Sequence, residues 1–374
     1  MESLFVGVLL NSKIITNVMP LERNHRVKLL RGYGMGITLK DNQIILKNGK
    51  HFYEKDHEIE CYFPSRFPYE RIVISGKGIL STDAIKTLSE NNVNVILTDS
   101  FGNPVSSFNF PMVSGKGSRN RIGQYDTFRD IAKLTYLQKQ ILHAKFQSQI
   151  YFLSQLKEDC RKVISMLKGF QKQIPNSDLR RMLTIEGQAS RVYFKLYASF
   201  FDEKYEFDTR RGIASNTKQN ATDVINALLN YGYTVLAGEI SKEINGQGLD
   251  AYYSFYHKNH DSFQSLTYDM IEPFRWLVEK TVYRLGNAKN KKLQIKKNQY
   301  VKHDKSGMVL LDTELVKKFL EMLEVDFRKT REYERRNGMK KENGLSNCAE
   351  ITIAKISIQN LSDFCVGKKQ EFKI

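Results

Sequence analysis

The chain of 374 residues is long enough for two domains of ordinary size, and its 41% hydrophobic content without a run of 18 apolar residues predicts globular domains and no membrane span. Lysine and arginine number 58 against 41 acidic residues, and the resulting net charge of +17 favours a nucleic-acid partner because contacts with phosphates release counterions. The four cysteines show no CxxC spacing, which argues against a disulfide framework or a cysteine zinc site and predicts a cytoplasmic protein.

The first hundred or so residues are predicted to be rich in β-strands. Short β-branched or alternating runs, bounded by turn residues, occur at 3–10, 36–49, 57–64, 69–76 and 93–108. One helix is expected at 81–92, with Ser81 as its N-cap. A glycine-rich, basic segment at 113–124 has no apolar period and marks the domain boundary. We therefore expect an α+β protein whose N-terminal domain, 1–115, is β-rich and sandwich-like.

The rest of the chain, 116–374, is predicted to be a larger all-α domain. Apolar residues recur there at helical spacing in five segments, 127–156, 178–201, 221–244, 264–285 and 312–334. Asp312 is the expected N-cap of the last of these helices. A basic tail begins at about 289, and its lysine-rich segment 289–302 predicts an exposed loop or strand. The sequence assigns no structure to the last 35 residues.

Three glycine-rich stretches, at 32–37, 75–78 and 114–117, are interpreted as turns. The first lacks the third glycine of the GxGxxG motif, and no helical pattern follows it. The other two, both SGKG, lack the GxxxxGK[ST] spacing that lets successive backbone amides hold a phosphate. The sequence therefore predicts no phosphate loop.

An acidic residue, Glu186, interrupts the apolar stripe of the helix expected at 178–201. Because it fills a gap in that stripe, we expect it on the core-facing side. A buried carboxylate needs a proton, a cationic partner or a metal ion, so a structural salt bridge to an arginine is one open interpretation. The neighbouring Gly187 costs about 1 kcal/mol relative to alanine unless another group must approach closely. The apolar positions of the stripe are Leu179, Met182, Leu183, Ala189, Tyr193, Leu196, Tyr197 and Phe200.

A second acidic cluster lies in the helix that begins near Ser265. Asp269 and Glu272 are three residues apart, so their carboxylates share one face. Pro273 predicts a kink there, because it cannot donate to the carbonyl group of Asp269 and its ring crowds that group. Two adjacent acids repel each other unless a cation lies between them. His257, in the preceding loop, offers a neutral nitrogen ligand, and His260 competes with it for that role.

This donor set, mostly oxygen with one imidazole, suits Mg²⁺ or Mn²⁺ better than zinc, which prefers more nitrogen and sulfur. A divalent ion on carboxylates in a basic protein indicates phosphodiester chemistry, in which the ion polarises phosphoryl oxygens. The residues alone therefore predict a metal-dependent enzyme that acts on nucleic acid.

Four ordered motifs carry a resemblance to a known family. The stretches IEGQASRVYF, NALLNYGYTVL, GLDAYYSFYH and SLTYDMIEPFRW resemble the CRISPR-associated Cas-one family, the integrase that captures new spacers. The resemblance is strong over 178–285, weaker over the N-terminal β-rich part, and absent from the basic tail. It implies a metal-dependent endonuclease and integrase that inserts spacers into the repeat array by attack of a DNA 3′-hydroxyl on a phosphodiester.

The resemblance also implies partners and residue roles. It implies a homodimer that assembles with the small Cas-two protein on double-stranded DNA, both the spacer precursor and the repeat array. Carried over motif by motif, Glu186, His257 and Glu272 are the metal ligands, and Asp269 has a supporting catalytic role. The family often has a basic residue shortly after the histidine, where this chain has Lys258 to Asp261, so no role is assigned there.

Three alternatives remain open at this point. A casposase-like transposon integrase shares the family's fold and often carries DNA-binding extensions, which the basic tail resembles. A non-catalytic DNA-binding scaffold is opposed by the complete Glu–His–Glu set. A plain nuclease would use water rather than a DNA 3′-hydroxyl as its nucleophile.

Overall fold

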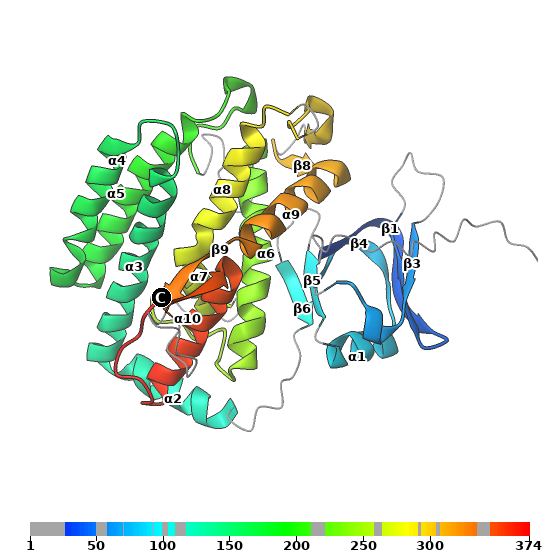
Figure 1. Cartoon of the computed structure of the whole chain (residues 1–374), viewed down its shortest axis with the longest axis horizontal. Helices are drawn as coiled ribbons and strands as arrows, with labels where there is room; N and C mark the ends of the chain where they lie inside the picture. The colour runs from blue at the N-terminus through cyan, green and yellow to red at the C-terminus, as the bar shows by residue number, and fades with distance from the viewer. Residues whose placement is uncertain are drawn as a thin grey trace, which may run out of the picture.

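The computed structural model describes residues 27–49, 58–69, 71–91, 93–98, 104–108, 117–210, 221–257, 264–290, 293–303, 307–334 and 345–374. The strand expected at 3–10, and Lys258 and His260, lie outside these residues. The described chain forms a sheet followed by a larger, mostly helical region (Figure 1).

The N-terminal region contains one six-stranded mixed sheet with the order β3-β2-β1-β4-β5-β6. Strands β1, β4 and β5 are parallel to one another, and the other pairs are antiparallel. Helix α1 (Thr82–Glu90) connects β4 to β5, and the Ser81 side chain accepts from Ala84 N at 3.2 Å, as expected of an N-cap. The strands are β1 (Val27–Lys40), β2 (Gln43–Lys47), β3 (Ile59–Tyr62), β4 (Arg71–Leu80), β5 (Asn94–Thr98) and β6 (Pro104–Phe108).

The sandwich-like arrangement expected for this region is not confirmed. The described residues of 27–108 form a single sheet, and its two faces are covered by helices rather than by a second sheet. Ile72 and Ile74 pack in the core that includes Ala84 and Leu88 of α1, whereas the intervening Val73 belongs to the core of the helical region. Successive side chains of β4 therefore point to opposite faces of the sheet and pack into both cores, as expected for a strand that is buried on both faces.

Two of the three glycine-rich stretches are not turns, contrary to the expectation from sequence. The SGKG at 75–78 lies inside β4, and the stretch at 32–37 lies inside β1, which pairs with it. Gly32 and Gly34 have φ of 86° and 76°, and the register shifts between Tyr33 and Met35. The glycines thus form a β-bulge, which an L-residue with positive φ would strain.

The region after 116 is mostly helical, but it is not all-α. Two short antiparallel pairs interrupt the helices, β7 (Tyr300–Lys302) with β8 (Val309–Leu311) and β9 (Thr330–Glu334) with β10 (Leu345–Ala349). The first pair confirms a strand within the basic segment 289–302. The helices are α2 (Gly117–Arg129), α3 (Ile131–Ser154), α4 (Arg161–Gln171), α5 (Leu179–Ala198), α6 (Val224–Gly246), α7 (Ser265–Ile271), α8 (Arg275–Gly286), α9 (Thr313–Arg328) and α10 (Glu350–Cys365).

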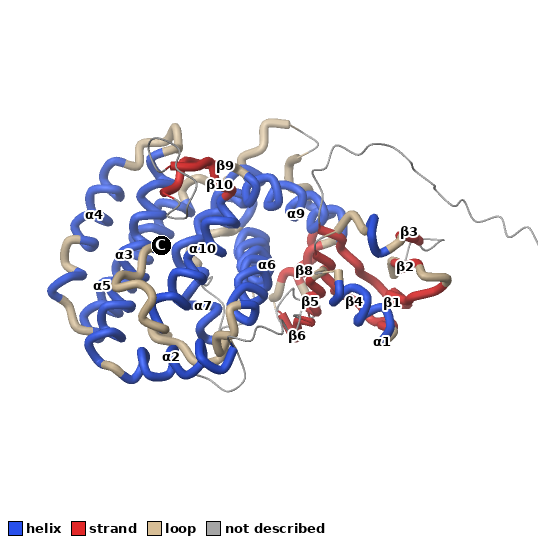
Figure 2. Tube along the Cα trace, turned by 60° about the horizontal axis from the view of Figure 1, so that its bottom comes forward, coloured by secondary structure: helices blue, strands red, loops and turns tan. Residues whose placement is uncertain are grey.

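Helix α6 is the central element and lies between the other helices and the sheet (Figures 1 and 2). It is apolar on every side, which is typical of a fully buried helix. On the sheet side, a Cβ atom at Gly238 would lie only 2.2 Å from Ile96 Cδ1, so glycine permits the close approach of β5. Arg71 Nε of β4 donates to Glu239 Oε1 at 2.7 Å and joins the two regions through a buried ion pair.

The expected helix boundaries hold where a local signal exists. Asp312 caps α9 by accepting from Leu315 N at 2.7 Å, but the helix expected over 312–334 is wrong at its end, because it stops at Arg328 and strand β9 occupies Thr330–Glu334. The segment expected as one helix over 127–156 divides at Asp130, whose carboxylate caps α3. Helices α4 and α10 were not expected from the sequence, nor was the part of α2 that lies within the glycine-rich segment 113–124. Within the described ranges, every helix is too short or too polar to cross a bilayer.

Candidate active site

The site lies where three segments distant in sequence meet. Glu186 is on α5, and Lys145 is on α3, which packs against both α5 and the short 3-10 turn η4 (Glu272–Phe274). The helix expected over 264–285 breaks at Pro273 into α7, η4 and α8, which confirms the predicted kink. The break places Glu272 at the end of α7, where its side chain reaches α3.

A lysine ammonium joins the two expected glutamates. Lys145 Nζ lies 2.5 Å from Glu186 Oε1 and 2.8 Å from Glu272 Oε2. The side chains of Lys145, Glu186 and Glu272 are 11%, 17% and 3% exposed, so Glu186 is nearest to solvent. The cationic partner of Glu186 is therefore a lysine, not the arginine considered from the sequence, and it is shared with a second carboxylate.

Further contacts fix each carboxylate. The Tyr256 hydroxyl donates to Glu186 Oε2 at 2.7 Å, and Arg275 Nη2 lies 2.8 Å from Glu272 Oε1. Glu272 Oε2 is buried, and its charge is met by the Lys145 ammonium at 2.8 Å. A buried carboxylate oxygen needs a cation of this kind, and a divalent ion meets the same need.

Asp269 orients the histidine. Its Oδ2 accepts from the amides of Phe255 and Tyr256, both at 2.9 Å, and its Oδ1 accepts from the amide of His257 at 2.9 Å. The same Oδ1 lies 2.6 Å from His257 Nδ1. This contact fixes the ring and directs Nε2 toward Glu272, whose Oε1 is 3.9 Å away. A carboxylate behind an imidazole is the usual support of a metal-binding histidine.

The charges of the site stabilise one another. Burial raises the pKa of Glu272, but Arg275, Lys145 and His257 outweigh burial and hold the pKa at about 2. Burial lowers the pKa of Lys145, and the two glutamates outweigh it, so the net direction is upward. Burial also lowers the pKa of His257, and the contact with Asp269 raises it above its ordinary value. The Glu272 carboxylate is therefore ionised at neutral pH.

Within the described part of the chain, no three His, Cys, Asp or Glu side chains are arranged to hold a metal ion directly. The Lys145 ammonium takes up the space on which Glu186 Oε1 and Glu272 Oε2 converge. The donor chemistry nevertheless fits a divalent ion, because two carboxylate oxygens meet at one cation and an oriented imidazole lies beside them. The buried acceptor of Glu272 supports the same conclusion.

The structure brings Glu186 and Glu272 to one ammonium, places the His257 ring 3.9 Å from Glu272, and puts Asp269 behind His257. The stripe of α5 was misjudged in part, since Leu179 and Leu183 are 39% and 49% exposed. Met182, Ile185, Ala189, Tyr193 and Tyr197 form the buried stripe instead.

Three residues of the site were missed from the sequence, Lys145, Tyr256 and Arg275. Lys145 had the same signal as Glu186, a charge within an apolar helical stripe, since Ile141, Leu142 and Phe146 around it are buried. Tyr256 and Arg275 stand inside motifs that carry the resemblance, but local spacing gives no indication of their partners.

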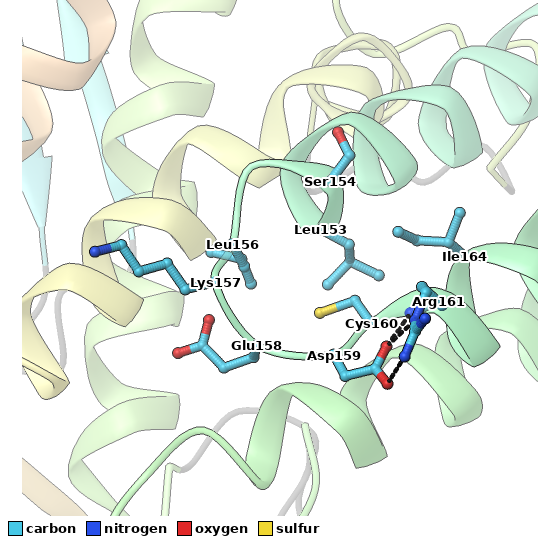
Figure 3. A pocket seen from close by; sticks show the side chains of 9 residues that line it. All are labelled: Leu153, Ser154, Leu156, Lys157, Glu158, Asp159, Cys160, Arg161 and Ile164. Carbon is cyan, nitrogen blue, oxygen red and sulfur yellow. Dashed lines mark hydrogen bonds and ion pairs between the residues drawn. The ribbon is translucent and has the colours of Figure 1, made fainter.

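A surface hollow at the turn between α3 and α4 is not part of this site (Figure 3). It has a volume of about 360 Å³, and none of the site residues line it. Arg161 and Asp159 close one side through two contacts of 2.8 Å. Burial raises the pKa of the Cys160 thiol there, so the thiol is a poor nucleophile.

Comparison with known proteins gives consistent matches. The family described as CRISPR associated protein Cas1 matches residues 30–325. A CRISPR-associated endonuclease Cas1 of Archaeoglobus fulgidus is 29% identical over 68% of this chain and 76% of its own length. A CRISPR-associated protein Cas1 of Methanobrevibacter ruminantium is 30% identical over 70% of this chain and 78% of its own length.

Solved structures share the fold. A casposase bound to its integration product superposes with a TM-score of 0.80 at 23% identity, and the match covers 93% of each chain. A Cas1 protein from Thermotoga maritima gives a TM-score of 0.71 at 18% identity over 93% of this chain and 99% of its own. The mixed architecture of a sheet followed by a mostly helical region is thus that of solved relatives.

Proposed function

The chain belongs to the CRISPR associated protein Cas1 family, and from this premise we propose that it is an endonuclease and integrase of CRISPR adaptation. It cuts and joins DNA strands to insert new spacers into a repeat array. Relatives that match more than two thirds of the chain bear the name endonuclease. The net charge of +17 is suited to two DNA substrates at once.

One observation carries the proposed chemistry. Two carboxylates from separate helices, Glu186 and Glu272, converge on a single cation beside an imidazole whose Nδ1 is bound to Asp269. Glu186, His257 and Glu272 would hold Mg²⁺ or Mn²⁺, which when bound polarises the scissile phosphate and favours loss of the proton of the attacking hydroxyl.

The chain's own residues define the geometry of the reaction. Glu186 is the more exposed carboxylate, so we place the scissile phosphate on its side of the site. Tyr256 and Arg275 hold the carboxylates of Glu186 and Glu272 in fixed orientations. A phosphodiester exchange needs no nucleotide hydrolysis, because one ester bond replaces another. The main task of the protein is to hold a DNA 3′-hydroxyl in line with the phosphate.

A second hollow, of about 520 Å³, is lined by residues of α3, α8 and α9, and we infer that it gives a path for DNA although the site residues themselves do not line it. It is lined by Trp276, which follows Arg275, and by Tyr151, further along the helix that carries Lys145. Lys280, Arg328 and Lys329 line it as well, and Lys280 Nζ is 5.2 Å from the centroid of the Trp276 ring. Cations next to aromatic walls are typical of surfaces that bind a DNA strand.

The proposed partners follow from the reaction. One site per protomer performs one strand transfer, so insertion of both spacer ends requires a homodimer. A solved neighbour of 19% identity and TM-score 0.71 is a Cas6-RT-Cas1–Cas2 complex. We infer that this chain also works with a Cas2 protein on double-stranded spacer precursor and repeat DNA. We further propose that its domain boundary lies near 115 and that its basic tail begins at about 289.

A strand-joining assay tests this function. A labelled short duplex, a supercoiled plasmid that contains the repeat, the cognate Cas2 protein and Mn²⁺ are combined with the wild-type chain or with Glu186→Gln. Joined product is expected only from duplexes with 3′-hydroxyl ends, only with the wild-type chain, and not in EDTA. Dideoxy ends should give none.

The same assay separates the alternatives. Equal joining to plasmids with and without the repeat would favour a casposase-like integrase, because such an enzyme would not need the CRISPR repeat as its target. Degradation of the duplex without joined product would reduce the function to that of a nuclease. DNA binding without either product would leave a scaffold.

A further inference from the structure

Lys145 is a buried cation at the point where the proposed metal ion would bind. It is 11% exposed and lies 2.5 Å and 2.8 Å from oxygens of Glu186 and Glu272. A divalent ion held by the same two oxygens would take the space that the ammonium now fills. The metal and the ammonium therefore exclude each other from this position, by contact as well as by charge.

Without any cation, the site would not hold its shape. Two carboxylates that converge on one point repel each other, and among the described residues Arg275 is the second cation at hydrogen-bond distance from Glu272. The ammonium thus supplies the positive charge that keeps α5 and η4 together before a metal arrives.

A second observation gives a candidate acceptor for the ammonium. Gln149 follows Lys145 on the same face of α3, four residues later, and a long helical side chain there is expected to be directed back toward the turn that carries Lys145. Gln149 is 5% exposed, and its Oε1 is buried without a hydrogen-bond partner among the described residues. A buried carbonyl oxygen without a donor is costly, so it is a ready acceptor for a displaced ammonium. The Arg275 guanidinium repels the ammonium in its present position.

We propose that Lys145 is a positioning residue that holds the metal site assembled before loading, and that on binding of a divalent ion its ammonium moves from the two carboxylates to Gln149 Oε1. This inference rests on the proposed metal site. It assigns opposite effects to two neighbours on α3. Loss of Lys145 removes a competitor of the metal, whereas loss of Gln149 removes the acceptor that makes displacement favourable.

The test measures Mn²⁺ binding by the electron paramagnetic resonance signal of free Mn²⁺, together with the thermal midpoint in EDTA and in Mn²⁺. Lys145→Met keeps the apolar stem and should bind Mn²⁺ about tenfold more tightly, which corresponds to ~1.4 kcal/mol. Its midpoint in EDTA should fall below that of the wild type, and Mn²⁺ should raise it by more. Lys133→Met, an exposed change on the same helix, should alter neither quantity.

Gln149→Leu provides the second variant. It should bind Mn²⁺ more weakly than the wild type, by about threefold or more, and should have no effect on affinity when combined with Lys145→Met. Mn²⁺ affinity that is unchanged or weaker in Lys145→Met overturns the inference while the metal site stands. An equal effect of Gln149→Leu with and without Lys145 also overturns it. If neither the wild type nor Lys145→Met binds Mn²⁺, the proposed metal site fails as well.

Discussion

Two of the buried charge clusters in the described part of the chain, around Glu239 and around Glu272, differ in the groups that surround the carboxylate. At the contact between sheet and helices, Glu239 of α6 accepts from Arg71 at 2.7 Å, and its other oxygen lies 3.5 Å from Lys355 Nζ. In the candidate site, Glu272 lies among Lys145, Arg275 and His257. Both carboxylates are almost fully buried, and neighbouring cations overcome the effect of burial and hold the pKa of each at about 2.

Burial and a lowered pKa therefore do not distinguish a structural cluster from a functional one. Each Glu239 oxygen faces one cation, at 2.7 Å and 3.5 Å, and no second carboxylate joins the described contacts of this cluster. Each Glu272 oxygen also faces a cation, at 2.8 Å, but this cluster adds a second carboxylate on the same ammonium and an oriented imidazole. The shared cation and the imidazole therefore distinguish the functional cluster better than a perturbed pKa does.

The largest expected effect is the loss of chemistry at the candidate site alone. Glu186→Ala, His257→Ala and Glu272→Ala should each abolish strand cleavage and joining, because each removes a proposed ligand of the one metal ion. DNA binding, measured by gel shift, should survive, since it depends on dispersed basic residues. Glu239→Gln is the control and should retain joining activity. Near-normal activity in two of the three alanine variants would show that the ligand assignment is wrong.

The second effect concerns stability at the structural cluster. Arg71→Met leaves Glu239 buried without its aligned partner and should lower the free energy of unfolding by about 3 kcal/mol. Denaturant unfolding measures the change, and Arg71→Met combined with Glu239→Met should recover most of it. Activity per folded molecule should not change. A single Arg71→Met variant as stable as the wild type would show that the pair is not structural.

Acid gives a further check on this pair. The folded-state pKa of Glu239, about 2, lies below its ordinary value of 4.5. Its contribution to stability is therefore fully present above about pH 4.5 and is lost as the pH falls toward about 2. The wild type should lose stability more steeply than Glu239→Gln across this window. Parallel curves would contradict the assigned ionisation.

The third effect concerns the support of the imidazole. Asp269→Asn keeps the size of the side chain but removes the charge that faces His257 Nδ1, so joining activity should fall by about 10- to 100-fold. The Mn²⁺ requirement should shift to higher concentration, whereas DNA affinity should not change. Wild-type activity in Asp269→Asn would mean that Asp269 serves to bind the three backbone amides and not to orient the imidazole of His257.

The smallest effect compares two glycines in helices. A Cβ atom at Gly187, beside Glu186, or at Gly169 of α4 would meet no atom within 4 Å. Both Gly→Ala changes should stabilise the fold by up to about 1 kcal/mol. Only Gly187→Ala should reduce joining, because the open space beside Glu186 is where we expect the DNA backbone. Equal activity of the two variants would place the DNA elsewhere.

Local signals in the sequence were sufficient for much of the site. The apolar period with Pro273 predicted both the helix and its break, and the gap in the α5 stripe drew attention to Glu186. The caps Ser81 and Asp312 were predicted because capping depends on residues only a few positions apart. These features were predictable because each rests on contacts within one or two helical turns.

The features that were missed depend on distant contacts. Lys145 pairs with residues far along the chain, and no local period shows which charges meet. The exposure of Leu183 could not be judged because the choice between Leu183 and Ile185 depends on the helix that α5 packs against. Gly76 resembled a turn residue, yet a Cβ atom there would lie 2.4 Å from the Gly32 carbonyl oxygen of the neighbouring strand.

Of the Glu239 and Glu272 clusters, we expect only the Glu272 cluster to bind a metal ion, and a count of bound Mn²⁺ tests this directly. Mn²⁺ is titrated into the wild type, Glu186→Gln, Glu272→Gln and Glu239→Gln, and the free ion is measured by its paramagnetic resonance signal. The account predicts tight binding at the site in the wild type and in Glu239→Gln, and its loss in the other two. Loss of that binding in Glu239→Gln, or its retention in both Glu186→Gln and Glu272→Gln, would contradict the account.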